Sequence, residues 1–316
     1  MQNIADRLTE RICRTKAPIV IGLDPVLART PDVYLKEKSS DYAGAARAIL
    51  EMNMDIIDAI AEYVPAVKPQ IAFYEMFGHE GVRAFEQTAA YAKEKGLLVV
   101  EDGKRNDIGN TAQAYADGHL GEVFVGGSKA QSPYNVDFLT VSPFLGPESL
   151  LPFVKAAEEY DKGLFILVKT SNPGSGMIQD IKREDGRTVS ESLAQLVHEY
   201  ACQYRGDSGY SPIGAVVGAT YPGEAGRLRR LMPYSILLVP GYGAQGGGAA
   251  DVVPNFNADG LGAIVNASRS ILFAYEAEYG KGCSRAEYKE SVRCAAVAMQ
   301  KEIYQEVFSS CPDIVY

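Results

Sequence analysis

Eight short apolar segments recur along the chain, and helical patterns or charged, glycine-rich loops separate them. They span residues 18–23, 64–67, 97–100, 137–141, 163–169, 213–217, 235–239 and 262–265. Short apolar runs without polar alternation are typical of strands buried on both faces of a parallel sheet. Eight such strands alternating with helices predict an α/β fold in which the strands close into a (β/α)8 TIM barrel.

An open, doubly wound sheet is the alternative arrangement of these elements. Its nucleotide-binding form carries a G-x-G-x-x-G turn after the first strand, and no such motif follows residues 18–23. A (β/α)8 barrel takes about 250 residues, whereas this chain has 316. We therefore expect a single TIM-barrel domain, residues 1–316, with extra N- and C-terminal helices.

Helix signals support the alternation. Apolar residues four apart predict an amphipathic helix over residues 3–14, lying on the protein surface or across the barrel floor. Thr188 with Glu191, and Ser284 with Glu287, have the spacing of a capping box. These pairs should begin two helices that run to about residues 204 and 308.

Composition excludes several classes of protein. A formal net charge of −9 argues against a general nucleic-acid binder, which needs a basic face. The 5 cysteines form no C-x-x-C pair and the 3 histidines form no H-x-x-x-H cluster, so no metal site is expected. No apolar run reaches the roughly 18 residues of a membrane span, and the N-terminus does not read as a signal peptide. We expect a cytoplasmic protein without a membrane partner.

The third apolar segment runs directly into the sequence E-D-G-K-R-N-D-I-G-N-T at residues 101–111. Residues two apart on a strand point to the same side, so Asp102 and Lys104 should project together. Asp107 should lie past the strand end, and Thr111 should cap a helix to about residue 119, followed by an irregular stretch to 135. Charged groups at the end of a buried strand are costly to desolvate unless they are paired or used.

Polar residues follow most of the other predicted strands as well. In a TIM barrel these carboxyl ends face one another around one mouth, where active sites lie. The residues at this mouth would be Asp24, Lys68, Asp102, Lys104, Thr170, Ser171, Asn172, residues 240–248 and Arg269. The glycine run of residues 241–248 should present bare backbone N–H groups that, with Arg269, cradle a phosphate. Each residue alone could be a structural ion pair or a surface turn; together they indicate a site.

The motif D-x-K-x-x-D-I-x-x-T at residues 102–111 resembles the signature of the orotidine 5′-phosphate decarboxylase family. Four further segments resemble its longer bacterial (type 2) subfamily. They are G-L-D-P at 22–25, V-K-P-Q at 67–70, K-T-S-N-P-G at 169–174, and P-G-Y-G-A-Q-G-G at 240–247 together with S-R-S at 268–270. The resemblance runs from about residue 18 to 271 and so covers the barrel.

This resemblance implies a homodimer with shared active sites that converts orotidine 5′-monophosphate (OMP) to UMP without metal or organic cofactor. The implied catalytic residues are Lys68, Asp102, Lys104 and Asp107, with Lys104 stabilising and protonating the carbanion at C6. The implied substrate-binding residues are Asp24 at the ribose, Ser171 at the pyrimidine ring, Thr111 (with Asp107) in the neighbouring subunit's site, and Pro240, Gln245, Gly246 and Arg269 around the 5′-phosphate. Residues 172–187 are the candidate lid.

Two alternatives remain open from the sequence. Related barrels that act on sugar phosphates also carry D-x-K-x-x-D but use Mg²⁺, so their activity would be lost in EDTA. Lys68 and residues 169–172 favour the pyrimidine substrate. A non-catalytic nucleotide-binding barrel is the other alternative, and it would bind UMP tightly without converting OMP. The intact Asp102 and Lys104 argue against it.

Overall fold

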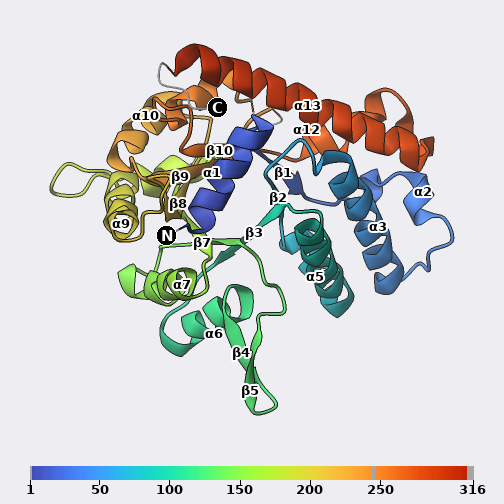
Figure 1. Ribbon diagram of the computed structural model, residues 1–316, viewed down its shortest axis with the longest axis horizontal. Helices are drawn as coiled ribbons and strands as arrows, with labels where there is room; N and C mark the ends of the chain where they lie inside the picture. The colour runs from blue at the N-terminus through green and yellow to red at the C-terminus, as the bar shows by residue number, and fades with distance from the viewer. Residues whose placement is uncertain (1, 244–245, 312–316) are drawn as a thin grey trace.

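Eight parallel strands close into a barrel in the computed structural model, which describes residues 2–243 and 246–311 (Figure 1). The strands are β1 (Ile19–Leu23), β2 (Ala66–Pro69), β3 (Leu98–Arg105), β6 (Phe138–Val141), β7 (Gly163–Lys169), β8 (Ser211–Val217), β9 (Ser235–Val239) and β10 (Ala263–Ala267). Their order around the barrel is β1-β10-β9-β8-β7-β6-β3-β2, so the first strand pairs with both the second and the last. This closure confirms the predicted TIM barrel and rules out the open sheet.

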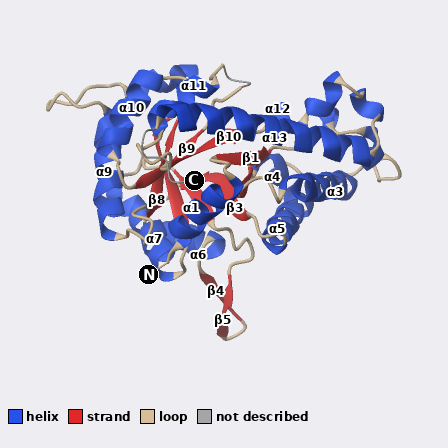
Figure 2. Ribbon diagram, turned by 45° about the horizontal axis from the view of Figure 1, so that its top comes forward, coloured by secondary structure: helices blue, strands red, loops and turns tan. Residues whose placement is uncertain are grey.

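Helices surround the ring of strands (Figure 2). The longer ones are α1 (Ile4–Thr15), α3 (Tyr42–Ile60), α5 (Gly78–Glu94), α6 (Gly109–His119), α7 (Pro147–Glu159), α9 (Val189–Gln203), α10 (Pro222–Leu231) and α13 (Arg285–Ser310). The shorter ones are α2 (Asp32–Leu35), α4 (Ala72–Glu75), α8 (Gly176–Gln179), α11 (Ala249–Val252) and α12 (Arg269–Leu272), and 3-10 turns lie at η1 (Leu27–Arg29), η2 (Pro173–Ser175), η3 (Val253–Asn255), η4 (Ala274–Ala277) and η5 (Gly280–Gly282). Within the described ranges, no helix combines the length and apolarity that a membrane span needs.

The N-terminal helix α1 lies across one opening of the barrel in both views (Figures 1 and 2). Its residues Ile4, Leu8 and Ile12 are at most 2% exposed and pack against inward-facing strand residues such as Val20 and Phe165. The predicted amphipathic helix is therefore confirmed. Because α1 fills this end of the barrel, the opposite end, where the strands finish, is the end to examine for a ligand site.

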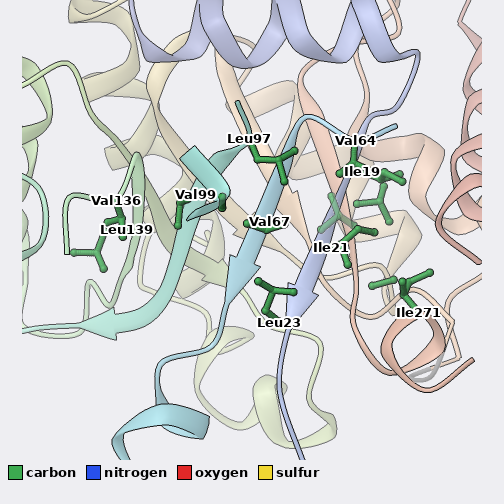
Figure 3. Close-up of a cluster of buried hydrophobic side chains, with 14 of the residues drawn as sticks. Ile19, Ile21, Leu23, Val64, Val67, Leu97, Val99, Val136, Leu139 and Ile271 are labelled. Carbon is green, nitrogen blue, oxygen red and sulfur yellow. The ribbon is translucent and has the colours of Figure 1, made fainter. Parts of the chain in front are cut away.

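A second layer of core separates the barrel from its helices (Figure 3). On β1, Ile19, Ile21 and Leu23 point into this outer layer together with Val67 of β2, whereas Val20 points inward to α1. This alternation follows from the two-residue period of a strand. Burial of each such side chain contributes about 1.5–3 kcal/mol, so both faces of the strands stabilise the barrel.

Both predicted capping boxes are present. The hydroxyl of Thr188 accepts from the Glu191 N–H at 3.1 Å, and the Glu191 carboxylate accepts from the Thr188 N–H at 2.7 Å. At the start of α13 the Ser284 hydroxyl accepts from the Glu287 N–H at 3.3 Å, and the Glu287 carboxylate accepts from the Ser284 N–H at 2.8 Å. Each box satisfies backbone donors that a helix start leaves unpaired.

The structure corrects one prediction near the motif of residues 101–111. Helix α6 begins at Gly109, with Ile108 at its N-cap position, so Thr111 lies inside the first turn and does not cap the helix. The strand β3 continues past its apolar run to Arg105, so Asp102 and Lys104 lie on the strand. Pairing with β6, rather than local apolarity, extends this strand.

Residues predicted to be irregular after α6 form an antiparallel hairpin of β4 (Glu122–Val125) and β5 (Ser128–Gln131), which projects from the barrel (Figures 1 and 2). Its turn is Gly126-Gly127, with φ of +58° and +94°. Two consecutive residues with positive φ are typical of a two-residue hairpin turn. The Gly-Gly pair was the sequence signal for this hairpin.

Candidate active site

A cavity of about 480 Å³ opens at the carboxyl ends of the strands, opposite α1. Every barrel strand, or the loop directly after it, contributes to the lining. The lining residues are Asp24, Lys68, Gln70, Phe73, Asp102, Lys104, Thr140, Leu167, Thr170, Ser171, Asn172, Val216, Leu238, Pro240, Gly241, Tyr242, Asn266, Ala267, Ser268, Arg269 and Ser270. The barrel thus brings together most of the residues expected at the mouth.

A carboxylate between two lysines lies on one wall of this cavity. The Lys68 amine donates to Asp102 Oδ2 at 2.8 Å, and the Lys104 amine donates to Asp102 Oδ1 at 2.5 Å. The hydroxyl of Thr140 also donates to Asp102 Oδ1, at 3.1 Å. The Lys68 side chain is 5% exposed, whereas that of Lys104 is 46% exposed and can reach a ligand.

The charges of this network stabilise one another. Burial by itself would raise the pKa of Asp102, but Lys68 and Lys104 outweigh burial and hold this pKa well below its usual value. Burial would likewise lower the pKa of Lys68, whereas Asp102 and Asp24 raise it. The carboxylate and the buried ammonium therefore both stay ionised at neutral pH.

A bulge in β3 places Lys104. Between Glu101 and Arg105 the pairing of β3 with β6 shifts register, and Lys104 has a φ of +45°. The backbone N–H of Lys104 donates to the Thr140 hydroxyl at 2.9 Å, which holds this left-handed conformation. A residue other than glycine in this region costs on the order of 1 kcal/mol or more, and such strain clusters at functional sites.

Two acceptors among the other cavity residues lack a partner within the described part of the chain. The Oδ1 atoms of Asp24 and Asn266 are buried and accept no hydrogen bond from any residue in the described part of the chain. Nearby, a Cβ added to Gly22 would lie 1.9 Å from the Ser268 hydroxyl oxygen, so glycine is needed for the close approach of β1 to the loop after β10. Unpaired acceptors beside a cavity suit a ligand that carries hydroxyl groups.

Some of the residues expected around the pyrimidine ring and the phosphate line the cavity, and others do not. Ser171, Pro240 and Arg269 line the cavity, with Arg269 exposed at its rim. Gly246 is exposed and lies outside the lining. Gln245 lies outside the residues that the structure describes.

The glycine-rich loop after β9 differs from the expected cradle. The N–H groups of Gly243, Gly246 and Gly247 donate to carbonyl groups of the loop itself, at 2.8, 2.8 and 3.1 Å. These donors are therefore not bare in this conformation. A local turn satisfies them, an outcome that glycine content alone does not reveal.

Asp107 and Thr111 do not line the cavity of their own chain. Asp107 follows β3, and its carboxylate accepts from the Ile108 N–H at 2.8 Å. Thr111 is exposed in the first turn of α6. Both residues thus lie apart from Lys68, Asp102 and Lys104.

Sequence reasoning missed several residues of the cavity, notably Gln70, Thr140 and Asn266. Thr140 is the one polar residue within the strand sequence F-L-T-V, and this was the available signal. Asn266 likewise interrupts the apolar strand A-I-V-N-A near its carboxyl end. Within the described ranges, no group of three or more His, Cys, Asp or Glu side chains is arranged to hold a metal ion.

A TIM barrel with an ion-paired carboxylate and two lysines in the cavity at its mouth belongs to the class of enzymes that act on small anionic molecules. Residues 18–279 match the orotidine 5′-phosphate decarboxylase / HUMPS family, and the chain belongs to this family. This result confirms the family that the motif of residues 102–111 indicated.

Similar proteins cover nearly the whole chain. It is 44% identical to the orotidine 5′-phosphate decarboxylase of Rhodopirellula baltica, over 96% of this chain and 99% of that protein. It is 39% identical to that of Caldicellulosiruptor saccharolyticus, over 93% and 99%. The structure of the Leishmania donovani OMP decarboxylase superposes with a TM-score of 0.73 at 29% identity, covering 97% of this chain and 100% of that one.

Proposed function

We propose that this chain is a carboxy-lyase that decarboxylates OMP to UMP, in the last step of de novo pyrimidine nucleotide synthesis, with Lys104 as the catalytic acid. One observation carries the proposal: the Lys104 amine lies in the cavity 2.5 Å from Asp102, whose other oxygen is bonded to buried Lys68. The family and the named relatives support the reaction.

The reaction gives each of these charges a purpose. Loss of CO₂ from C6 of the orotate ring leaves an electron pair on a carbon with no adjacent group to accept it. A fixed ammonium at that point stabilises the developing charge and then donates a proton to C6. Asp102 orients the Lys104 amine and lies close to the departing carboxylate, and Lys68 balances its charge. Lys104, at 46% side-chain exposure, can regain a proton from solvent.

The remaining cavity residues would bind the rest of the nucleotide. The unpaired Oδ1 of Asp24 suits a ribose hydroxyl donor, and Ser171 would contact the pyrimidine ring. Arg269 at the rim would bind the 5′-phosphate, helped by Gln245 and by the backbone near Pro240 and Gly246. Because the glycine-loop N–H groups donate within the loop, we expect Arg269 to contribute more to phosphate binding than this loop does.

Turnover with a chelator present tests the proposal. Purified protein mixed with OMP in EDTA should convert it to UMP, followed by UV absorbance. The Lys104→Ala variant should lose turnover while UMP binding largely survives, and the Lys155→Ala control, on the exposed side of α7, should match wild type. Activity that requires added Mg²⁺ would indicate a sugar-phosphate enzyme of the same family. Tight UMP binding with no conversion of OMP would indicate a non-catalytic barrel.

We further propose a homodimer in which Asp107 and Thr111 complete the partner's site. Their position outside the cavity of their own chain supports this, as does the neighbouring Ile108, which is 55% exposed. Inactive Lys104→Ala protein mixed with inactive Asp107→Ala protein should regain some activity through hybrid dimers. Absence of recovery, once subunit exchange is demonstrated, would show that each site is built from one chain.

We also propose that the chain is a single domain, residues 1–316, and that it works in the cytoplasm without metal or organic cofactor. All five cysteines are free thiols, which suits a reducing compartment. Its ligand is a small molecule, and the net charge of −9 makes nucleic acid an unsuitable partner.

A further inference from the structure

Lys169, the last residue of β7, is a buried lysine that the reaction does not use. It is 1% exposed, and its amine contacts the Asp180 carboxylate and, at 3.0 Å, the Glu224 carboxylate. The amine also lies 4.8 Å from the centre of the Tyr221 ring. Burial would lower the pKa of Lys169, but Asp180 and Glu224 raise it, so the group stays charged.

The two carboxylates come from different loops at the barrel mouth. Glu224 lies in the first turn of α10, after β8. Asp180 directly follows α8, within the segment 172–187 that joins β7 to α9. Lys169 therefore ties this segment to the neighbouring strand–helix unit.

A second set of contacts joins the same segment to the cavity. The Gln179 side chain accepts from the Thr170 N–H at 3.0 Å and donates to the Thr170 hydroxyl at 2.8 Å. Thr170, Ser171 and Asn172 all line the cavity. The conformation around Asp180 is thus linked, through Gln179, to Thr170 and to the two cavity residues that follow it.

The segment 172–187 also carries exposed apolar side chains beside this mouth. Met177 is 80% exposed, Ile178 49% and Ile181 54%. The Asp180 and Glu224 side chains are themselves 44% and 34% exposed, so water could satisfy both carboxylates without Lys169. A buried ion pair adds little net stability. The effect of this one is to fix the position of the segment 172–187.

We propose that Lys169 is a positioning residue for the decarboxylation, which holds the segment 172–187 where Thr170, Ser171 and Asn172 meet the pyrimidine nucleotide. The inference rests on the proposed function. The contacts of Lys169 with Asp180 and Glu224 then determine how this segment covers the bound nucleotide. Misplacing binding groups by about 1 Å can cost a hundredfold in rate.

The test compares Lys169→Met with Lys162→Met, a matched control because Lys162 is a buried lysine just before the other end of β7, remote from the cavity. Lys169→Met and Asp180→Asn should each lower kcat/KM for OMP about 10- to 100-fold. The double variant should lose no more than Lys169→Met alone, since both act through one contact. Lys162→Met should stay within twofold of wild type.

Hydrogen exchange gives a readout that a purely structural role would not change. UMP should protect the amides of residues 172–187 in wild type and in Lys162→Met, and much less in Lys169→Met. Unchanged kcat/KM and UMP protection in both Lys169→Met and Asp180→Asn would overturn the inference. If Lys169→Met does not fold, Asp180→Asn decides alone, since its side chain is partly exposed. Failure of wild type to convert OMP would instead refute the proposed function.

Discussion

Replacing Lys162 should raise the stability of the barrel without changing its activity. Lys162 lies just before β7 at the end of the barrel opposite the cavity, and its side chain is 9% exposed. Its amine donates to Asn135 Oδ1 at 2.9 Å and lies 3.9 Å from Asp137. Burial lowers the pKa of Lys162 from 10.5 to about 8, although Asp137 acts in the opposite direction.

The magnitude of a Lys162→Met change follows from this pKa. Each pH unit of lowering corresponds to about 1.36 kcal/mol, so keeping the ammonium charged in the fold at pH 7 costs roughly 3 kcal/mol. Methionine removes that cost and the Asn135 hydrogen bond, worth about 1 kcal/mol. Asp137 keeps the Val99 N–H at 2.9 Å and Lys93 at 3.4 Å. The free energy of unfolding of Lys162→Met should therefore exceed that of wild type by about 2 kcal/mol, which raises Tm by about 4 °C.

The pH dependence gives the sign. Below the folded pKa of about 8 the full cost is present. Between pH 8 and the unfolded value near 10.5 the unfolded chain binds more protons, so wild-type stability rises with pH relative to the variant. The advantage of Lys162→Met should therefore be largest below pH 8 and be lost before pH 10.5, once the remaining cost falls to the roughly 1 kcal/mol of the missing Asn135 hydrogen bond.

Thermal unfolding of both proteins from pH 6 to 10.5, with kcat/KM measured at pH 7, checks this reasoning. Lys155→Met, on the exposed side of α7, is the control and should leave Tm unchanged. A lower Tm for Lys162→Met at pH 7, or an advantage that grows with pH, would refute the argument that a desolvated charge destabilises the barrel here.

Three further changes address the cavity and the wall behind it. Asp24→Ala should raise KM for OMP about 10- to 100-fold, because the variant loses a hydrogen bond between a charged carboxylate and the substrate. Its Tm should not fall. An unchanged KM would contradict ribose binding by Asp24. Lys68→Met should lower kcat about 100-fold or more because Asp102 loses its buried cation, and full activity in a steady-state assay would show that Lys68 is only structural. His119→Phe keeps an aromatic side chain but removes the 2.7 Å contact with fully buried Glu101, so the free energy of unfolding in denaturant should fall by about 1–3 kcal/mol because Glu101 loses a buried partner. A loss below about 1 kcal/mol would mean that water reaches this carboxylate.

The elements of the fold were largely predictable because their signals are local. Each of the eight apolar segments overlaps a barrel strand, and the segments 163–169 and 235–239 match β7 and β9. Both capping boxes occur because Ser or Thr and a Glu three residues later contact each other within one turn. Local patterns carry less information where partners are distant: the part of β3 beyond its apolar run pairs with β6.

The sequence by itself determined the barrel, its family and which charged residues gather at the mouth, since strand ends must converge once eight parallel strands close. Only the tertiary structure decided how these residues meet. The left-handed φ of Lys104 depends on a hydroxyl 36 residues away, that of Thr140. The glycine loop uses its own donors, and Asp107 lies outside its own cavity. The periodicity of a segment indicates which of its faces is buried. The placement of a side chain to within about one ångström depends on contacts between distant segments, which no local pattern encodes.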